Sequence, residues 1–180
     1  MQINVGYFHF IKDEFFELVD DKELMKNKES GSQRPCYYCF KSKANDKIMW
    51  FIPVSTKVEK YKKIYDKKIK KQIKLGKNPS VDTIVFGYVS NVYSTFLIQN
   101  MFPVTEQYIE NQYIRNNVTI RLSNKLAKEI IEKANKVLTL YNNGMKNIVF
   151  PDIDKILEIL LNANKERVVE KNTKKSIKVE

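Results

Sequence analysis

The chain has 180 residues, 43% of them hydrophobic, and a net charge of +11. This length fits one domain, and the apolar fraction is sufficient to form a core. The sequence has no apolar run long enough to cross a membrane, and its N-terminus lacks the pattern of a signal peptide, so we expect a cytoplasmic protein. We assign residues 1–165 to a single domain and expect residues 166–180, which are polar and mixed in charge, to form a frayed tail.

The N-terminal part of the chain predicts strands and one short helix. Alternating apolar residues predict a strand over 2–11, acidic residues at the start of the next segment predict a helix over 13–19, and a polar segment predicts a loop over 26–33. Two further strands, 36–42 and 47–54, flank a tight turn. These two strands are therefore expected to form a hairpin.

Cys36 and Cys39 have the spacing of a redox pair or of half a zinc site. A zinc site needs four ligands, and His9 is the single histidine of the chain. A redox pair normally lies at a helix N-terminus, whereas the aromatic residues around these cysteines favour a strand. We therefore expect buried or half-buried thiols without chemistry. His9 lies within the first predicted strand, which favours a core or edge position over a catalytic role.

Residues 57–77 form the most distinctive segment, with ten lysines and two acidic residues. Apolar residues recur every three or four positions from Val58 to Ile73, which predicts a helix with one core-facing stripe and lysines around the rest of its surface. The helix is expected to end at Gly76. Crowded like charges cost stability and a polyanion would relieve them, although lysine-rich helix faces are commonly only solvated. A membrane surface is the weaker alternative, because the stripe has no Trp or Phe anchor.

The C-terminal half alternates between short strands and amphipathic helices. Ser123 is a good N-cap for a long helix that ends near Gly144. The remaining predictions are strands over 83–89, 95–99, 118–122 and 147–150, a helix capped by Thr105 that extends to 113, and a helix over 152–162. Mostly antiparallel strand pairs with helices between them indicate an α+β domain around a small, strongly curved sheet.

Ser55, Thr56 and Lys57 stand at the junction between an apolar strand and the basic helix. Two hydroxyls, an ammonium and the amides of a helix N-terminus can bind a phosphodiester and stabilise charge on a phosphorane. Thr56 and Glu59 also fit a capping box, which would make the same residues structural. The two interpretations are compatible. Lys57 favours the functional one, because the helix dipole disfavours a cation in the first turn.

Three segments together resemble a known family. They are Arg34-Pro35 at the start of a strand, Pro53-Val-Ser-Thr-Lys57 before a basic helix, and Phe96-Leu-Ile-Gln-Asn-Met-Phe-Pro-Val104. They are similar to the toxins of type III toxin–antitoxin systems, the ToxN, AbiQ, CptN and TenpN group, and most similar to the CptN/TenpN branch. The resemblance covers about residues 1–150, and its motifs are short.

This resemblance implies a fold and an activity. The fold would be α+β, with a compact, strongly curved and mostly antiparallel sheet related to the MazF/Kid barrel, and with added helices. The activity would be that of a metal-independent endoribonuclease without cofactors, which leaves a 2′,3′-cyclic phosphate and a 5′-hydroxyl on cellular or phage RNA. Its partner would be a small repeat-derived RNA antitoxin in a closed protein–RNA assembly.

The resemblance also implies roles for individual residues. Ser55 and Thr56 match the hydroxyl step of the family, and Lys57 is the candidate for its lysine. The pattern Thr-Ser-Pro-Lys of ToxN places the lysine one residue later, so Lys60 can share or take this role. The resemblance also implies that Arg34, at the start of a strand, contacts RNA. It implies that Gln99 and Asn100 are polar groups of the RNA groove or of the site.

The mechanism that we expect is cleavage of single-stranded, adenine-rich RNA by its own 2′-hydroxyl. Ser55 or Thr56 would orient the phosphate and Lys57 would stabilise the phosphorane, with help from Arg34 or Lys60. The general base would be a lysine of depressed pKa or the substrate itself. Tyr37, Tyr61 and Tyr65 can stack bases, although core packing is at least as favoured for the last two. The antitoxin would run along Lys60, Lys63, Lys67, Lys70 and Lys71.

Two functions of other classes are compatible with the sequence. The first is a non-catalytic nucleic-acid-binding module, in which Lys57→Ala weakens binding only modestly. The second is a MazF-like ribonuclease with a protein antitoxin, since an acidic helix can satisfy the lysines as RNA does. The ratio of absorbance at 260 to 280 nm after purification separates an RNA partner from a protein partner.

Overall fold

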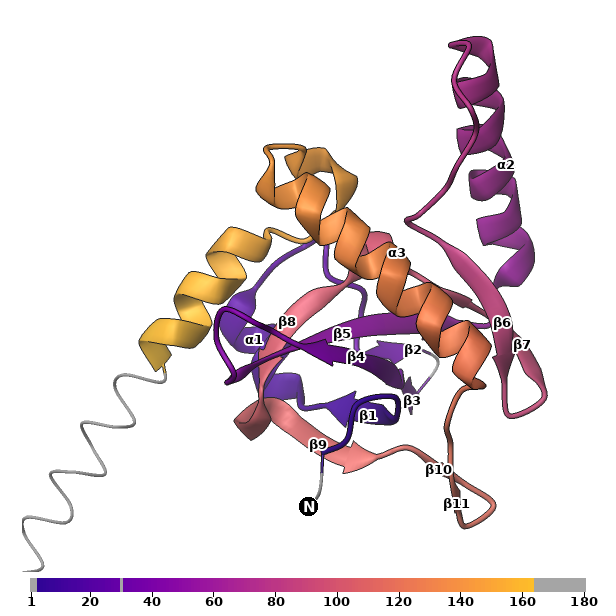
Figure 1. Cartoon of the computed structure of the whole chain (residues 1–180). Helices are drawn as coiled ribbons and strands as arrows, with labels where there is room; N and C mark the ends of the chain where they lie inside the picture. The colour runs from indigo at the N-terminus through magenta and orange to yellow at the C-terminus, as the bar shows by residue number, and fades with distance from the viewer. Residues whose placement is uncertain (1–2, 30, 164–180) are drawn as a thin grey trace, which may run out of the picture.

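A mostly antiparallel sheet forms the centre of the protein (Figure 1). The computed structural model describes residues 3–29 and 31–163, so Gln2 of the first predicted strand and the predicted tail, 166–180, lie outside the described residues. The sheet contains β1 (Phe8–Ile11), β4 (Cys36–Lys41), β5 (Ile48–Ser55), β6 (Val85–Val89), β7 (Val92–Phe96), β8 (Phe102–Thr105) and β9 (Ile109–Gln112). Its strand order is β6-β7-β5-β4-β1-β9, with β8 also paired to β5.

These strands confirm the predicted α+β class. The predicted hairpin is present as β4 and β5, with Tyr37 opposite Ile52. The strongly curved sheet that we expected and the barrel implied by the family resemblance are not detected among the described residues. Among the described strands, the pairing ends at β6 on one side and at β9 on the other, and these two strands do not pair with each other.

Strand β5 is the central strand of the sheet. All eight of its residues are buried, and one of its edges pairs with β4. On the other edge, Ile48–Phe51 pairs with β8, whereas Val54 and Ser55 pair with β7. Pro53 lies between these two ladders, where its missing N–H interrupts neither of them. The last residue of β5, Ser55, is therefore held against Thr95 of β7.

The described residues contain four α-helices. They are α1 (Asp13–Val19), α2 (Val58–Lys74), α3 (Asn124–Asn142) and a helix over 153–163. Short 3-10 turns occur at Ile98–Asn100, Glu106–Tyr108 and Lys146–Ile148, and two small hairpins pair β2 (Lys28–Glu29) with β3 (Ser32–Gln33) and β10 (Ile114–Arg115) with β11 (Val118–Thr119). None of the described helices is long and apolar enough to span a membrane.

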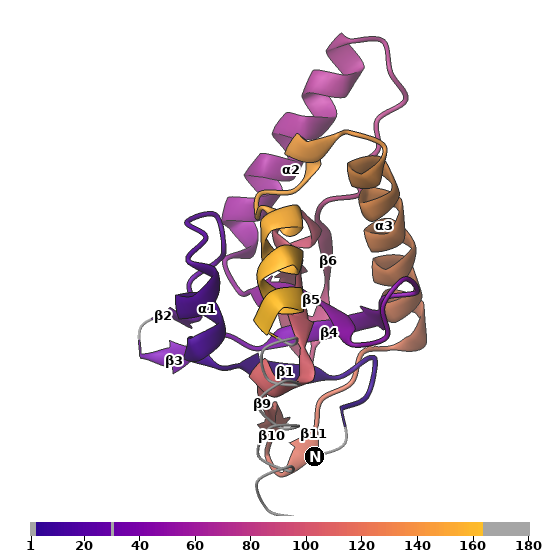
Figure 2. The same ribbon diagram turned by 90° about the vertical axis from the view of Figure 1, so that its left-hand side faces the viewer.

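Helix α2 begins directly after β5 and extends away from the sheet (Figures 1 and 2). Val58 and Tyr61 in its first turns are buried, but the apolar stripe loses its cover further along, and Ile73 is 58% exposed. The helix ends at Lys74, and Gly76 follows with a φ of 67°, which confirms the predicted termination near this glycine. The distal half of α2 therefore presents most of its lysines to solvent.

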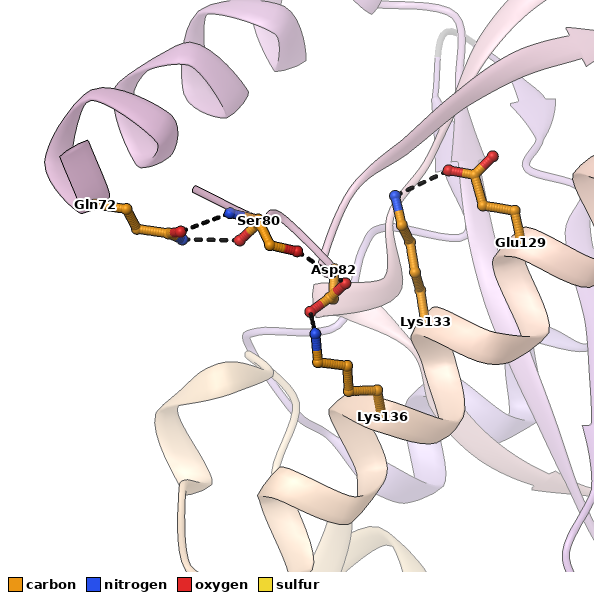
Figure 3. Close-up of polar contacts among 6 residues, drawn as sticks. All are labelled: Gln72, Ser80, Asp82, Glu129, Lys133 and Lys136. Atoms are coloured by element: carbon orange, nitrogen blue, oxygen red, sulfur yellow. Dashed lines mark hydrogen bonds and ion pairs between the residues drawn. The ribbon is translucent and has the colours of Figure 1, made fainter. Parts of the chain in front are cut away.

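The segment that returns from α2 is fastened to both long helices (Figure 3). The Gln72 side chain of α2 donates to the Ser80 carbonyl at 2.8 Å and accepts from the Ser80 amide at 2.7 Å. Asp82 then forms an ion pair with Lys136 of α3. These contacts link the C-terminal end of α2 to α3 through a short stretch of chain.

Helix α3 crosses the sheet and covers part of its core. The Ser123 hydroxyl accepts from the Leu126 amide, which confirms the predicted N-cap. The buried residues of α3 recur at helical spacing and are Ile130, Ala134, Val137 and Tyr141. Near its start, α3 packs so tightly on β6 that a Cβ at Gly87 would lie 2.4 Å from Leu126 Cδ2. The hairpin of β6 and β7 is thus supported from behind by α3.

Three secondary-structure predictions were wrong, and the strand predicted over 95–99 is correct only to Phe96, where β7 ends and the turn Ile98–Asn100 follows. The helix predicted from Thr105 to 113 is only the turn Glu106–Tyr108 between β8 and β9, and Thr105 makes no side-chain cap. The strand predicted over 147–150 overlaps the 3-10 turn Lys146–Ile148 instead. The loop predicted over 26–33 contains the hairpin of β2 and β3. In the first case, pairing of β8 with β5 and of β9 with β1 outweighs the local capping signal.

Candidate active site

A pocket of about 440 Å³ lies at the end of β5. It brings together Ser55, Thr56, Lys57 and Arg34, the three predicted catalytic residues and the predicted RNA-binding arginine. The remaining lining residues are Phe8, Ser32, Gln33, Pro35, Val54, Val89, Val92, Ser94, Tyr113 and Arg115. Ser55, Thr56 and Lys57, which were predicted from one short motif, thus line the same pocket as Arg34, which was predicted from the start of another strand.

The geometry of the hydroxyl step differs from a capping box. Lys57 is the N-cap residue of α2 and makes no side-chain cap. The Ser55 Oγ instead accepts a hydrogen bond from the Lys57 amide at 3.2 Å, and Glu59 pairs with Lys62 at 3.0 Å. The predicted capping box between Thr56 and Glu59 was therefore wrong. Because the Ser55 hydroxyl accepts in this contact, its hydrogen can still donate to a phosphate oxygen.

Arg34 is fixed beside Ser55 by the backbone. Its Nη1 donates to the Val54 carbonyl at 3.0 Å and its Nε donates to the Lys26 carbonyl at 3.3 Å. Together with Lys57 and Arg115, Arg34 gives the pocket three cations, and the other residues that line it are uncharged. Such a concave, cationic lining favours an anion such as a phosphodiester.

Sequence reasoning missed several residues of this pocket. Arg115 donates through Nη1 to the Ser90 carbonyl at 3.3 Å. The side-chain amide of Gln33 donates to the Glu110 carboxylate at 2.8 Å. Tyr113 is half-buried, and its amide donates to the Phe8 carbonyl at 2.8 Å. These residues come from β3 and from the segment between β9 and β11, and no local motif marks them. Only the pairing of distant strands brings them to Ser55.

The lysines of α2 form a second cationic surface next to the pocket. Lys63, Lys67, Lys70, Lys71 and Lys74 surround Asp66 along the exposed side of the helix, and we call them the lysine face. Lys60 is exposed and its ammonium lies 5.4 Å from the Tyr61 ring. Tyr61 is buried, and Tyr65 packs against Phe86 at 5.6 Å, which supports their core-packing interpretation.

The fold of most of the chain is also found in other proteins. The fold matches a chain from a bacterial type III toxin–antitoxin system in which a non-coding RNA pseudoknot inhibits the toxin, with a TM-score of 0.60, 14% identity and coverage of 89% of this chain and 99% of that chain. It also matches AbiQ, a lactococcal anti-phage endoribonuclease of a type III system, with a TM-score of 0.60, 16% identity and coverage of 90% and 99%. The chain shares its fold with type III toxins. No protein-family model and no curated protein matches its sequence.

Three predicted RNA-binding residues lie neither in the pocket nor on α2. Tyr37 is fully buried, and its ring lies 5.3 Å from Phe8 and 5.9 Å from Phe96. Burial also raises the pKa of its phenol, and an enclosed ring cannot stack on a base. Gln99 and Asn100 are both buried within the 3-10 turn Ile98–Asn100. We therefore remove these three residues from the candidate RNA interface.

The lysine of depressed pKa expected as a general base is present, but away from this pocket. Burial lowers the pKa of Lys68. Its ammonium donates to Thr83 at 2.8 Å and to Gln99 at 2.7 Å. It lines a separate cavity between α2 and α3 together with Asp82 and Leu140. Lys68 therefore serves the packing of α2 and does not supply a base next to Ser55.

The two cysteines and the histidine have the structural roles predicted for them. Cys36 and Cys39 are buried free thiols. Burial raises the pKa of Cys36 to about 12 and also raises that of Cys39, which keeps both thiols protonated and unreactive. His9 lies opposite Cys36 in β1 and is fully buried beside Tyr38 and Phe51.

We expect His9 to make stability depend on pH. Burial lowers the pKa of His9 below its ordinary value of 6.5, and the backbone of Asn4 opposes this shift only in part. The unfolded chain therefore binds a proton that the folded chain does not, so stability is full above 6.5 and falls as the pH decreases below it. Thermal unfolding followed by circular dichroism should show a Tm that decreases from neutral to mildly acidic pH. The decrease should be smaller for His9→Phe, and an equal decrease in both proteins would contradict the role of His9.

Proposed function

We propose that this protein is the toxin of a type III toxin–antitoxin system, of the CptN/TenpN branch, and that it acts as a metal-independent endoribonuclease. Its substrate is single-stranded, adenine-rich cellular or phage RNA in the cytoplasm, where cleavage would restrict phage growth. The observation that carries the proposal is the convergence of Ser55, Thr56, Lys57 and Arg34 on one cationic pocket. The fold shared with two type III system proteins supports it.

The reaction begins when a ribose 2′-oxygen attacks the adjacent phosphorus. The 5′-oxygen of the next nucleotide leaves, which produces a 2′,3′-cyclic phosphate and a 5′-hydroxyl. Ser55 and Thr56 hold the non-bridging oxygens by hydrogen bonds, and alignment of the attacking and leaving oxygens supplies much of the rate. Lys57 stabilises the negative charge that develops on the phosphorane. Arg34, which is held by the Val54 carbonyl, binds the same phosphate or its neighbour.

Proton transfer in this mechanism involves the substrate itself. Lys68 is occupied by Thr83 and Gln99, and His9 is enclosed in the core. A phosphate oxygen of the RNA can accept the proton of the 2′-hydroxyl as the phosphorane forms, and this proton passes to the 5′-oxygen as that oxygen leaves. Positive charge from Lys57, Arg34 and Arg115 stabilises the resulting monoanionic phosphorane.

The inhibitor in this proposal is a small repeat-derived RNA in a closed protein–RNA assembly. Helix α2 connects the pocket, which Lys57 lines, to the lysine face. A folded RNA bound along the lysine face and Lys60 can place one of its ends in the pocket. Substrate and inhibitor would then compete for the same cations. Inhibition of the related toxin by an RNA pseudoknot supports this arrangement.

The proposal is tested by mapping the ends of cleaved RNA. Protein freed of bound nucleic acid is incubated in EDTA with a mixed-sequence RNA, and the products are analysed by mass spectrometry. We expect discrete cuts with 2′,3′-cyclic phosphate and 5′-hydroxyl ends. A substrate with a single deoxyribose at the mapped position removes the attacking hydroxyl and should remain intact there.

Ser55→Ala serves as the matched protein variant in this experiment. It removes the hydroxyl and keeps the strand, since Ser55 is paired through its backbone to Thr95. Loss of cutting in this variant ties the activity to the pocket and excludes a contaminating ribonuclease. Tight RNA binding by the wild-type protein without any cleavage would leave a non-catalytic RNA-binding module and overturn the proposal.

A further inference from the structure

The hairpin of β6 and β7 carries exposed aromatic side chains outside the pocket. Tyr88 pairs with Tyr93 across the hairpin, and Phe86 lies two residues before Tyr88, so the three rings share one face. We call them the aromatic row. The Tyr88 and Tyr93 centroids are 5.0 Å apart and those of Phe86 and Tyr93 are 6.4 Å apart. Tyr88 is 63% exposed and Tyr93 is 39% exposed, so two rings are open to a ligand.

The opposite face of this hairpin is fully engaged. Val89, Val92 and Ser94 line the pocket. Gly87 lies against Leu126 of α3 so closely that no side chain would fit between them. Arg115 also holds the carbonyl of Ser90 at the hairpin turn. The aromatic row therefore stands on a strand pair that is fixed from behind, which lowers the entropic cost of binding a flexible ligand on it.

The surroundings of the aromatic row favour a polyanion. The Lys62 ammonium lies 5.7 Å from the centre of the Tyr93 ring. Tyr65 of α2 packs against Phe86, so the row adjoins the helix that carries the lysine face. Exposed rings next to cations are the combination that binds single-stranded nucleic acids, because bases stack on the rings and phosphates contact the cations. A purely apolar protein partner would gain nothing from these lysines.

We propose that the aromatic row is a base-stacking platform for single-stranded RNA. Bases of the RNA strand that extend out of the pocket, beyond the β6–β7 hairpin, stack on Tyr88 and Tyr93, and Lys62 contacts the intervening phosphate. This assignment deepens the proposed function and rests on it. It gives the protein a means of preferring unpaired RNA, since bases within a duplex cannot reach the rings.

The test measures the affinity for a short 2′-O-methyl oligoadenylate, which lacks the attacking hydroxyl, so binding is separated from cleavage. The comparison ligand is an abasic backbone of the same length. For the double variant Tyr88→Ala/Tyr93→Ala we expect oligoadenylate binding to weaken by about tenfold or more, because stacking on each ring is lost. Affinity for the abasic backbone should be unchanged. The double variant with Phe at both positions keeps the rings and should bind as the wild type does.

Phe150→Ala is the matched control, because Phe150 is an exposed aromatic residue that follows the turn Lys146–Ile148, outside the β6–β7 hairpin. The stacking proposal is overturned if the double alanine variant binds oligoadenylate as tightly as the wild type, even where the wild type cleaves RNA. It is also overturned if this variant changes only the sedimentation of the RNA-free protein, which would make the row an interface between copies. If the wild type binds oligoadenylate through these rings and cuts no RNA, the stacking proposal holds and the nuclease proposal fails.

Discussion

Lys57→Ala is expected to reduce the rate of RNA cleavage by about 100-fold or more, as removal of a group that stabilises transition-state charge commonly does. Lys57 lines the pocket at the N-cap of α2, next to the Ser55 hydroxyl. The loss should appear in kcat, because the charge that Lys57 stabilises is greatest on the phosphorane. Single-turnover cleavage of a labelled RNA that contains one mapped site gives this rate directly.

Two lysine variants complete this experiment. Lys74→Ala removes the same charge from the distal end of α2, where Lys74 belongs to the lysine face, and should leave the single-turnover rate nearly unchanged. Lys60→Ala tests the one-residue displacement from the family pattern. If Lys60→Ala loses the activity and Lys57→Ala retains it, the assignment of Lys57 is wrong and the essential ammonium is that of Lys60.

Phe96→Ala should have the largest effect on stability. Phe96 is fully buried, and its ring lies 6.3 Å from Phe8 and 5.9 Å from Tyr37. Removing a buried phenyl ring leaves a cavity and costs about 3–5 kcal/mol. Phe96 also pairs with Val54 in the ladder that holds Ser55. We therefore expect a decrease of this size in the free energy of unfolding, measured by urea denaturation.

Phe150→Ala removes the same ring from an exposed position, since Phe150 is 49% exposed. Its effect on the free energy of unfolding should be within about 0.5 kcal/mol. Similar unfolding midpoints for the Phe96 and Phe150 variants would contradict the core position of Phe96. A Phe96 variant that remains folded at low temperature is also expected to cleave more slowly there, because β7 supports one wall of the pocket.

Elements with a strong local signal were predicted well from the sequence. Helix α1 spans the predicted residues, and α3 begins after Ser123, where a capping hydroxyl precedes an amphipathic pattern. The errors arise where a local signal competes with pairing to a distant strand. Thr105 suggested a helix start, but it is the last residue of a strand that pairs with β5. The secondary structure of Thr105 is therefore determined by pairing with residues more than fifty positions away in the sequence.

The candidate site was predicted in part for the same reason. Ser55, Thr56 and Lys57 are adjacent in sequence, so their joint position in the pocket follows once the strand and helix are recognised. Tyr37 was placed in the RNA interface because an aromatic residue in a strand can face either side, and the alternation alone does not say which side is covered. Arg115 was missed because its proximity to Ser55 depends on the path of the whole chain.

The split pairing of β5 also bears on the order in which the protein assembles during synthesis. The hairpin of β4 and β5 closes through a short turn, so it can form as soon as Ser55 has been made. The partner of Ser55 in β7, Thr95, lies forty residues later, beyond the whole of α2. Arg115, on another wall of the pocket, comes later still. A growing chain therefore acquires its hydroxyls and lysine early and has no complete pocket until more than half of it has left the ribosome. Under the proposed nuclease function, an unfinished chain would therefore lack the complete pocket needed to cleave its own template.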